Sequence, residues 1–83
     1  MKNIIISQTQ YNKCSNGKPL YIYFNNDDNN SIKVELLDKD YIITIYDDGF
    51  THQIYMVDVN EVDNPSKLSN IINRIISEDD IIL

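Results

Sequence analysis

The sequence predicts an α+β fold, a mainly antiparallel sheet of four to five strands with one C-terminal amphipathic helix packed on it. Apolar and polar residues alternate with a period of two, typical of strands, through the middle of the chain. Two-residue turn signals separate these segments, and the apolar period changes to that of a helix near the C-terminus. Fifteen isoleucines and no alanine also favour sheet over helix. Because 83 residues can bury only one core, we expect a single domain over residues 1–83.

The earliest clear strand pattern is Leu-Tyr-Ile-Tyr-Phe at residues 20–24. Its three apolar residues alternate with Tyr21 and Tyr23, so these two rings should point away from the core. Asn16-Gly17, just before this strand, is a strong hairpin signal, which makes residues 4–13 its partner strand. The alternative is a short helix that the glycine terminates.

Residues 25–31 contain only Asn, Asp and Ser, and this polar run predicts an exposed loop. A meander of three strands should follow from residue 31 to residue 59. Asp38-Lys39-Asp40 and Asp47-Asp48-Gly49 supply its two turns, and the second contains the favoured Asp-Gly pair.

The C-terminal helix should begin at Asn64-Pro65, since Asn caps free backbone N–H groups and Pro is favoured in the first turn. Apolar residues then recur at i, i+3, i+4, i+7 and i+8 as one stripe, which favours packing on the sheet over burial of a partner. The members of the stripe are Leu68, Ile71, Ile72, Ile75 and Ile76. The apolar tail Ile81, Ile82 and Leu83 should extend the helix, add an edge strand or form an oligomer interface.

Composition restricts the compartment and the class of partner. Cys14 is the single cysteine, so no internal disulfide can form, and we expect a reducing cytoplasm. The N-terminal apolar run is too short for a signal peptide, and no run is long enough to span a bilayer. A net charge of −6 and a pI near 4.4 disfavour direct binding to nucleic acid or to anionic membranes.

The residues that catalysis and metal binding require are scarce. Nucleophilic catalysis by Cys14 would need His52 as its base, and nothing in their spacing supports that pair. An EF-hand loop counted from Asn25 fails where Leu36 replaces the bidentate glutamate. We therefore expect no enzyme activity, no catalytic residues, no metal site and no cofactor.

Acidic residues are unevenly distributed along the chain. Residues 1–26 carry a charge of +3, whereas residues 27–83 carry −9. In an antiparallel meander, Asp27 and Asp28 fall at the same end of the sheet as Asp47 and Asp48. Such a carboxylate row either increases solubility or binds Lys and Arg on a partner. Together with the outward Tyr21 and Tyr23, these four aspartates are the predicted partner-binding residues.

Small size, acidity, the AT-rich codons that Ile and Asn imply, and a small sheet with a helix together resemble phage-encoded anti-defence proteins, notably small acidic anti-CRISPR inhibitors. The resemblance is one of general character over the whole chain and involves no shared motif, so it assigns no role to any residue. It implies a stoichiometric inhibitor that masks the basic nucleic-acid-binding surface of a bacterial defence nuclease by imitating phosphates with carboxylates. The alternative is a structural or regulatory subunit, or an immunity-type protein, that acts through an oligomer or a hetero-complex.

Overall fold

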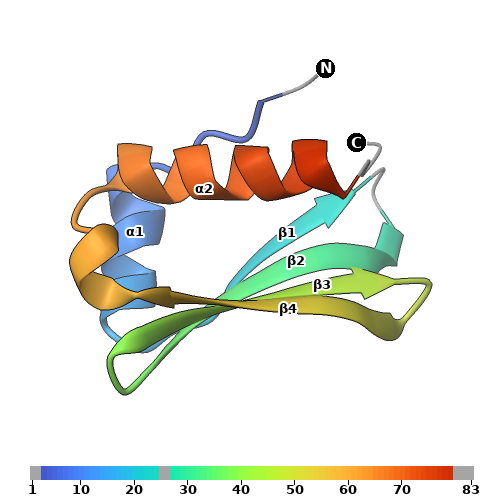
Figure 1. The fold of residues 1–83 in the computed structure, drawn as a ribbon, viewed down its shortest axis with the longest axis horizontal. Coiled ribbons are helices and arrows are strands. Elements are labelled where there is room, and N and C mark those ends of the chain that lie inside the picture. Colours follow the sequence, from blue (N-terminus) through green and yellow to red (C-terminus); the bar gives the residue numbers. More distant parts are fainter. Residues whose placement is uncertain (1–2, 25–26, 80–83) are drawn as a thin grey trace.

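The computed structural model describes residues 3–24 and 27–79, with the backbone alone for Asp27 and Asp28. It confirms the predicted α+β fold: a four-stranded antiparallel sheet with a C-terminal helix. In chain order the elements are α1 (Gln8–Ser15), β1 (Leu20–Phe24), β2 (Asp27–Leu37), β3 (Asp40–Asp47), β4 (Phe50–Asp58), a 3-10 turn (Val59–Glu61) and α2 (Pro65–Glu78). Figure 1 shows α2 lying across one face of the sheet, with α1 at one end on the same side.

The sheet follows the predicted meander, with the strands in the order β1-β2-β3-β4. Asp38 and Lys39 connect β2 to β3, and Asp48 and Gly49 connect β3 to β4. Asp48 and Gly49 have φ of 53° and 84°, as the two central residues of a type I′ hairpin turn require. Because Asp, Asn and Gly tolerate positive φ better than other residues, the local sequence was sufficient to locate this turn.

The polar run at residues 25–31 is not the exposed loop that we expected, because β2 begins at Asp27 and pairs with β1. The backbone N–H of Gly49 donates to the carbonyl of Asn29 at 2.9 Å, and the N–H of Asp48 donates to the side-chain oxygen of Asn30 at 3.0 Å. The start of β2 is therefore held by the β3–β4 turn as well as by β1. Residues 25 and 26 lie outside the described part of the chain.

The predicted strand at residues 4–13 is wrong, and the alternative of a short helix is correct. The hydroxyl of Ser7 accepts from the N–H of Gln10, whose side chain accepts from the N–H of Ser7, so a capping box starts α1. The helix ends in a Schellman motif, in which Gly17 has φ of 94° and donates to the carbonyl of Cys14. Asn16-Gly17 is thus a helix terminator here, because the capping box makes the preceding segment helical.

The core lies between the sheet and the two helices. Four members of the predicted stripe of α2 are buried and Ile71 is half-buried, which confirms that this face packs on the sheet. The buried stripe residues are Leu68, Ile72, Ile75 and Ile76. Alternate residues of the strands meet them, and Ile32, Val34, Ile43 and Ile45 are nearly inaccessible to solvent. Within the described ranges no helix is long and apolar enough to cross a membrane.

Two side chains of α2 form hydrogen bonds with the backbone of the segment that precedes α1. The side-chain amide of Asn73 accepts from the N–H of Ile4 at 2.8 Å and donates to its carbonyl at 2.9 Å. The hydroxyl of Ser69 accepts from the N–H of Ile6 at 2.9 Å. The side chain of Asn73 therefore satisfies both backbone groups of Ile4, as a neighbouring strand would. Ile6 is buried in the core.

Asn73→Ala should lower the free energy of unfolding by about 1–3 kcal/mol relative to Asn70→Ala, because only Asn73 bonds to the backbone of Ile4. Asn70 is exposed on the same helix, so comparing the two alanine variants cancels the gain in helix propensity that each alanine brings. Urea unfolding followed by circular dichroism would measure the difference. Equal midpoints for the two variants would contradict the proposed role of Asn73.

Candidate functional site

One face of the sheet is left open, since no described segment crosses the side opposite α1 and α2 (Figure 1). We call this the open face. Tyr21 and Tyr23 lie on it with 46% and 50% of their surface exposed, as their alternation with apolar residues predicts. The register places Lys33, Thr44 and Tyr46 on the same face, on β2 and β3. The open face therefore presents aromatic rings that a partner can reach.

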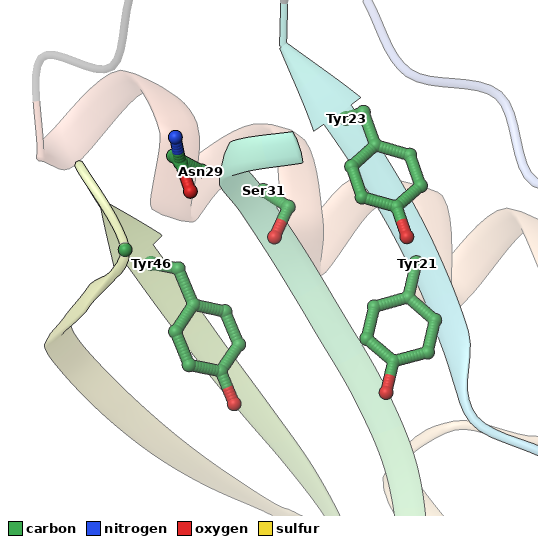
Figure 2. Close-up of a pocket in the computed structure, with 6 residues that line it drawn as sticks. Tyr21, Tyr23, Asn29, Ser31 and Tyr46 are labelled. Atoms are coloured by element: carbon green, nitrogen blue, oxygen red, sulfur yellow. The ribbon is translucent and has the colours of Figure 1, made fainter. Parts of the chain in front are cut away.

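A hollow of about 340 Å³ lies on the open face and has a serine between two tyrosines. Ser31 on β2 pairs with Tyr23 of β1 on one side and with Tyr46 of β3 on the other. Ser31 is small and buried, so the side chains of Tyr23 and Tyr46 extend further from the sheet than its hydroxyl does. Figure 2 shows Ser31 on the strand between Tyr23 and Tyr46, with the ring of Tyr46 extending to the level of Tyr21. The residues that line this tyrosine hollow are Tyr21, Tyr23, Asn29, Ser31, Tyr46 and Gly49.

The two tyrosines of β1 form one wall of the hollow. Their ring centroids are 6.1 Å apart and their planes differ by 8°. Figure 2 shows both hydroxyl groups pointing in the same direction along the strand. Two parallel rings at neighbouring positions of an edge strand present a continuous π surface to a ligand or a partner.

Lys33 lies beside the hollow and is paired with Glu35 at 3.4 Å. Loss of solvation acts to lower the pKa of Lys33, but the carboxylate of Glu35, together with Tyr21 and Tyr46, outweighs it, so the pKa is raised. The side chain is therefore protonated at neutral pH, and its charge is offset by that of Glu35. Lys33 of β2 pairs with Tyr21 of β1, so this ion pair lies at the side of the hollow away from the β3–β4 turn.

The other side of the hollow adjoins an acidic turn. Gly49 lines the hollow, and Asp47 and Asp48 precede it with exposed side chains. The backbone of Asp27 and Asp28 starts β2 at this same end of the sheet, while their side chains lie outside the description. Five other acidic residues lie around the opposite end, close to the β2–β3 turn or after β4: Asp38, Asp40, Asp58, Glu61 and Asp63.

Sequence reasoning missed an apolar area at the far end of the open face. Leu37, Ile54 and Met56 are 53%, 53% and 68% exposed, and Ile42 pairs with Met56 across β3 and β4. The signal that could have revealed this area is which alternate residues of β4 face the core. Tyr55 and Val57 pair with Ile43 and Tyr41 of the core, so the residues that alternate with them must face outward. The sequence did not reveal which face of β4 is buried, because both faces of this strand carry apolar residues.

Cys14 and His52 occupy unrelated places in the fold. Cys14 on α1 is completely buried, and its thiol lies 3.6 Å from the carbonyl oxygen of Val34. Burial, with a smaller effect of Glu35, raises the pKa of this thiol above its ordinary value. His52 is exposed on β4, where the pairing with β3 is irregular.

Native Cys14 should react slowly with Ellman's reagent at pH 8 and rapidly in guanidinium chloride, because only unfolding exposes the thiol and restores its lower pKa. Because the pKa of Cys14 is higher in the folded than in the unfolded protein, the buried thiol contributes to the free energy of unfolding below the unfolded thiol pKa of about 8.5. This contribution is lost as the pH rises toward the folded pKa. Tm should therefore fall above pH 8.5, less steeply in Cys14→Ala. Fast labelling of the native protein would contradict the burial of Cys14.

Among the predicted partner-binding residues, the structure places Tyr21 and Tyr23 in one hollow with Tyr46 and Ser31, and Asp47 and Asp48 in the turn whose Gly49 lines that hollow. In the described chain, no group of three His, Cys, Asp or Glu residues could hold a metal ion. The predicted oligomer residues Ile81, Ile82 and Leu83 lie outside the described residues. Comparison with known proteins finds no matching family model, no matching curated protein and no matching solved structure.

Proposed function

We propose that this chain is a non-enzymatic binding protein, a stoichiometric inhibitor that masks the basic nucleic-acid-binding surface of a partner. The observation that supports it is the continuity of the tyrosine hollow with the acidic turn at Asp47 and Asp48 on an open sheet face. Sites that bind single strands combine positive charge for phosphates with surfaces for stacked bases. A surface with carboxylates beside aromatic rings can compete for such a site.

The overall charge favours the same kind of partner. A net charge of −6 repels phosphate and attracts Lys/Arg-rich surfaces, which accelerates encounter and selects against acidic partners. The chain should act in a bacterial cytoplasm as an anti-defence protein of the anti-CRISPR type, with a nucleic-acid-binding nuclease as the partner. Inhibition then requires one copy for each partner and no covalent chemistry.

A competition experiment tests this function. Purified bacterial defence nucleases, CRISPR effectors included, would be immobilised in turn, and binding of this chain would be measured with and without a saturating guide or target oligonucleotide. We expect at least one nuclease to bind the chain and the oligonucleotide mutually exclusively, with affinity that falls as salt rises. Simultaneous binding of both to every nuclease that captures the chain would refute masking of the nucleic-acid site.

A second candidate function is a structural or regulatory subunit, or an immunity-type protein, that acts through an oligomer. The exposed Ile54 and Met56 on the edge strand β4 favour it, because apolar side chains at an unpaired sheet edge promote association. Sedimentation velocity distinguishes the two functions. The inhibitor should be a monomer, whereas a stable dimer that Met56→Lys dissociates would favour the subunit.

A further inference from the structure

We infer that the tyrosine hollow is a binding site for one arginine side chain, which stacks on the exposed rings of Tyr21, Tyr23 and Tyr46 near Ser31. The inference rests on the proposed function only where it assigns that arginine to the basic partner. The site itself follows from the spacing of the residues across three strands and from the charge around them, and it can be tested without any partner protein.

The spacing of the three strands suits one planar group. Tyr23, Ser31 and Tyr46 form a single row across β1, β2 and β3. Neighbouring strands lie about 4.8 Å apart, so the two tyrosine backbones are separated by about 10 Å. Figure 2 shows the rings of Tyr21, Tyr23 and Tyr46 nearly face-on in this view of the open face, so their faces point away from the sheet. Because Ser31 leaves the hollow between the tyrosines open, one planar group can lie in it against these rings.

The electrostatic surroundings select a cation for this place. The face of a tyrosine ring attracts cations, and three rings surround the hollow. Gly49 of the β3–β4 turn lines the hollow, and Asp47 and Asp48 of the same turn are exposed and make this end of the sheet negative. Lys33 lies on the other side, but its ammonium group is 3.4 Å from Glu35, which offsets its repulsion. A nucleotide would stack on the same rings, yet its phosphate would meet these aspartates and the overall charge of −6.

Arginine fits these conditions better than lysine does. Its guanidinium is planar, always charged and more weakly hydrated than an ammonium group, so it stacks on aromatic rings with a smaller loss of hydration. It can also direct several N–H donors to a neighbouring carboxylate while it remains stacked. Basic nucleic-acid-binding surfaces contain many arginines, so the site gives the proposed inhibitor a specific anchor in addition to long-range attraction.

The test uses three blocked tripeptides, Gly-Arg-Gly, Gly-citrulline-Gly and Gly-Lys-Gly, and AMP, each titrated into the isotope-labelled protein. Citrulline has nearly the shape of arginine without its charge. We expect the arginine peptide to give saturable NMR shifts in the ring signals of Tyr21, Tyr23 and Tyr46. Its dissociation constant should be at least about threefold lower than those of the other probes, since only arginine is both flat and cationic.

Variants locate the binding to the hollow. Tyr23→Phe and Tyr46→Phe keep a ring and should retain binding, whereas Tyr23→Leu and Tyr46→Leu should each weaken it at least about threefold. Ile54→Ala is the matched control, because Ile54 is exposed on the same face outside the hollow. Circular dichroism would establish that every variant is folded, and partial exposure of both tyrosines makes this the expected result.

Three results would overturn the arginine site: equal affinity for citrulline and arginine, shifts with AMP but not with arginine, or no saturable shift with any peptide. None of these depends on a nuclease, so each would leave the competition between chain and oligonucleotide standing as a separate result. Conversely, arginine binding without any masked nuclease would retain the site and refute the proposed function.

Discussion

Replacing Ile72 with aspartate should unfold the protein. Ile72 lies in the middle of the buried stripe of α2 and has no exposed surface. A carboxylate there would have to be buried without a partner or be protonated, at a cost of several kcal/mol. A domain of this size has an unfolding free energy at the lower end of the usual range of about 5–15 kcal/mol, so the loss should abolish the cooperative transition.

Two further variants make this test specific. Asn70→Asp places the same charge on an exposed position of α2 and should leave the melting curve close to that of the wild type. Ile72→Val removes one methylene and should cost only about 0.5–1.5 kcal/mol. Far-ultraviolet circular dichroism during urea and thermal unfolding would measure all three. A cooperative, near wild-type transition for Ile72→Asp would show that α2 does not pack as described.

The second large effect should appear in partner binding when Asp27, Asp28, Asp47 and Asp48 are all changed to asparagine. If these residues imitate phosphates, the association rate with a masked nuclease should fall about tenfold or more at low salt, because electrostatic steering is removed. The dissociation rate should change less. Asparagine tolerates the positive φ of Asp48, so the turn and the fold should persist. Stopped-flow mixing at several salt concentrations would measure these rates.

An equal change of charge at the other end of the sheet is the matched control. Asp38→Asn, Asp40→Asn, Asp58→Asn and Glu61→Gln combined also remove four negative charges, but far from the tyrosine hollow. We expect a smaller loss of association rate from this variant. Equal losses from the two variants would mean that only net charge matters. No loss from either would assign the acids to solubility.

The sequence was sufficient for those elements in which local signals and hydrophobic pattern agree. The β3–β4 turn has both an Asp-Gly pair and alternating strands on each side, and α2 has both a capping Asn64-Pro65 and an apolar stripe. The outward direction of Tyr21 and Tyr23 followed because a strand alternates its side chains whatever its neighbours are. For these features, the register and the cap depend on residues only a few positions away.

The tertiary structure decided how α1 packs and which conformation residues 27–30 adopt. Asn16-Gly17 suits a hairpin and a helix end equally. The capping box of Ser7 and Gln10 is a local signal for the helix that the sequence already contained, and the buried contact of Cys14 with Val34 holds this helix against β2. The Asn and Asp residues at positions 27–30 have low strand propensity, yet pairing with β1 and with the distant turn at Asp48 fixes their backbone. These contacts join residues far apart in sequence.

The candidate site divides in the same way. Tyr21, Tyr23 and the aspartates could be identified from the sequence because alternation and turn chemistry are local. The hollow could not, because it depends on the register that aligns Tyr23, Ser31 and Tyr46 across three strands. A shift of one residue in either pairing would move Ser31 to the core face and close the space between the rings. For Tyr21 and Tyr23, the sequence alone thus determined that they are exposed, while cross-strand pairing determined which residues they meet, because register is set by the packing of the whole core.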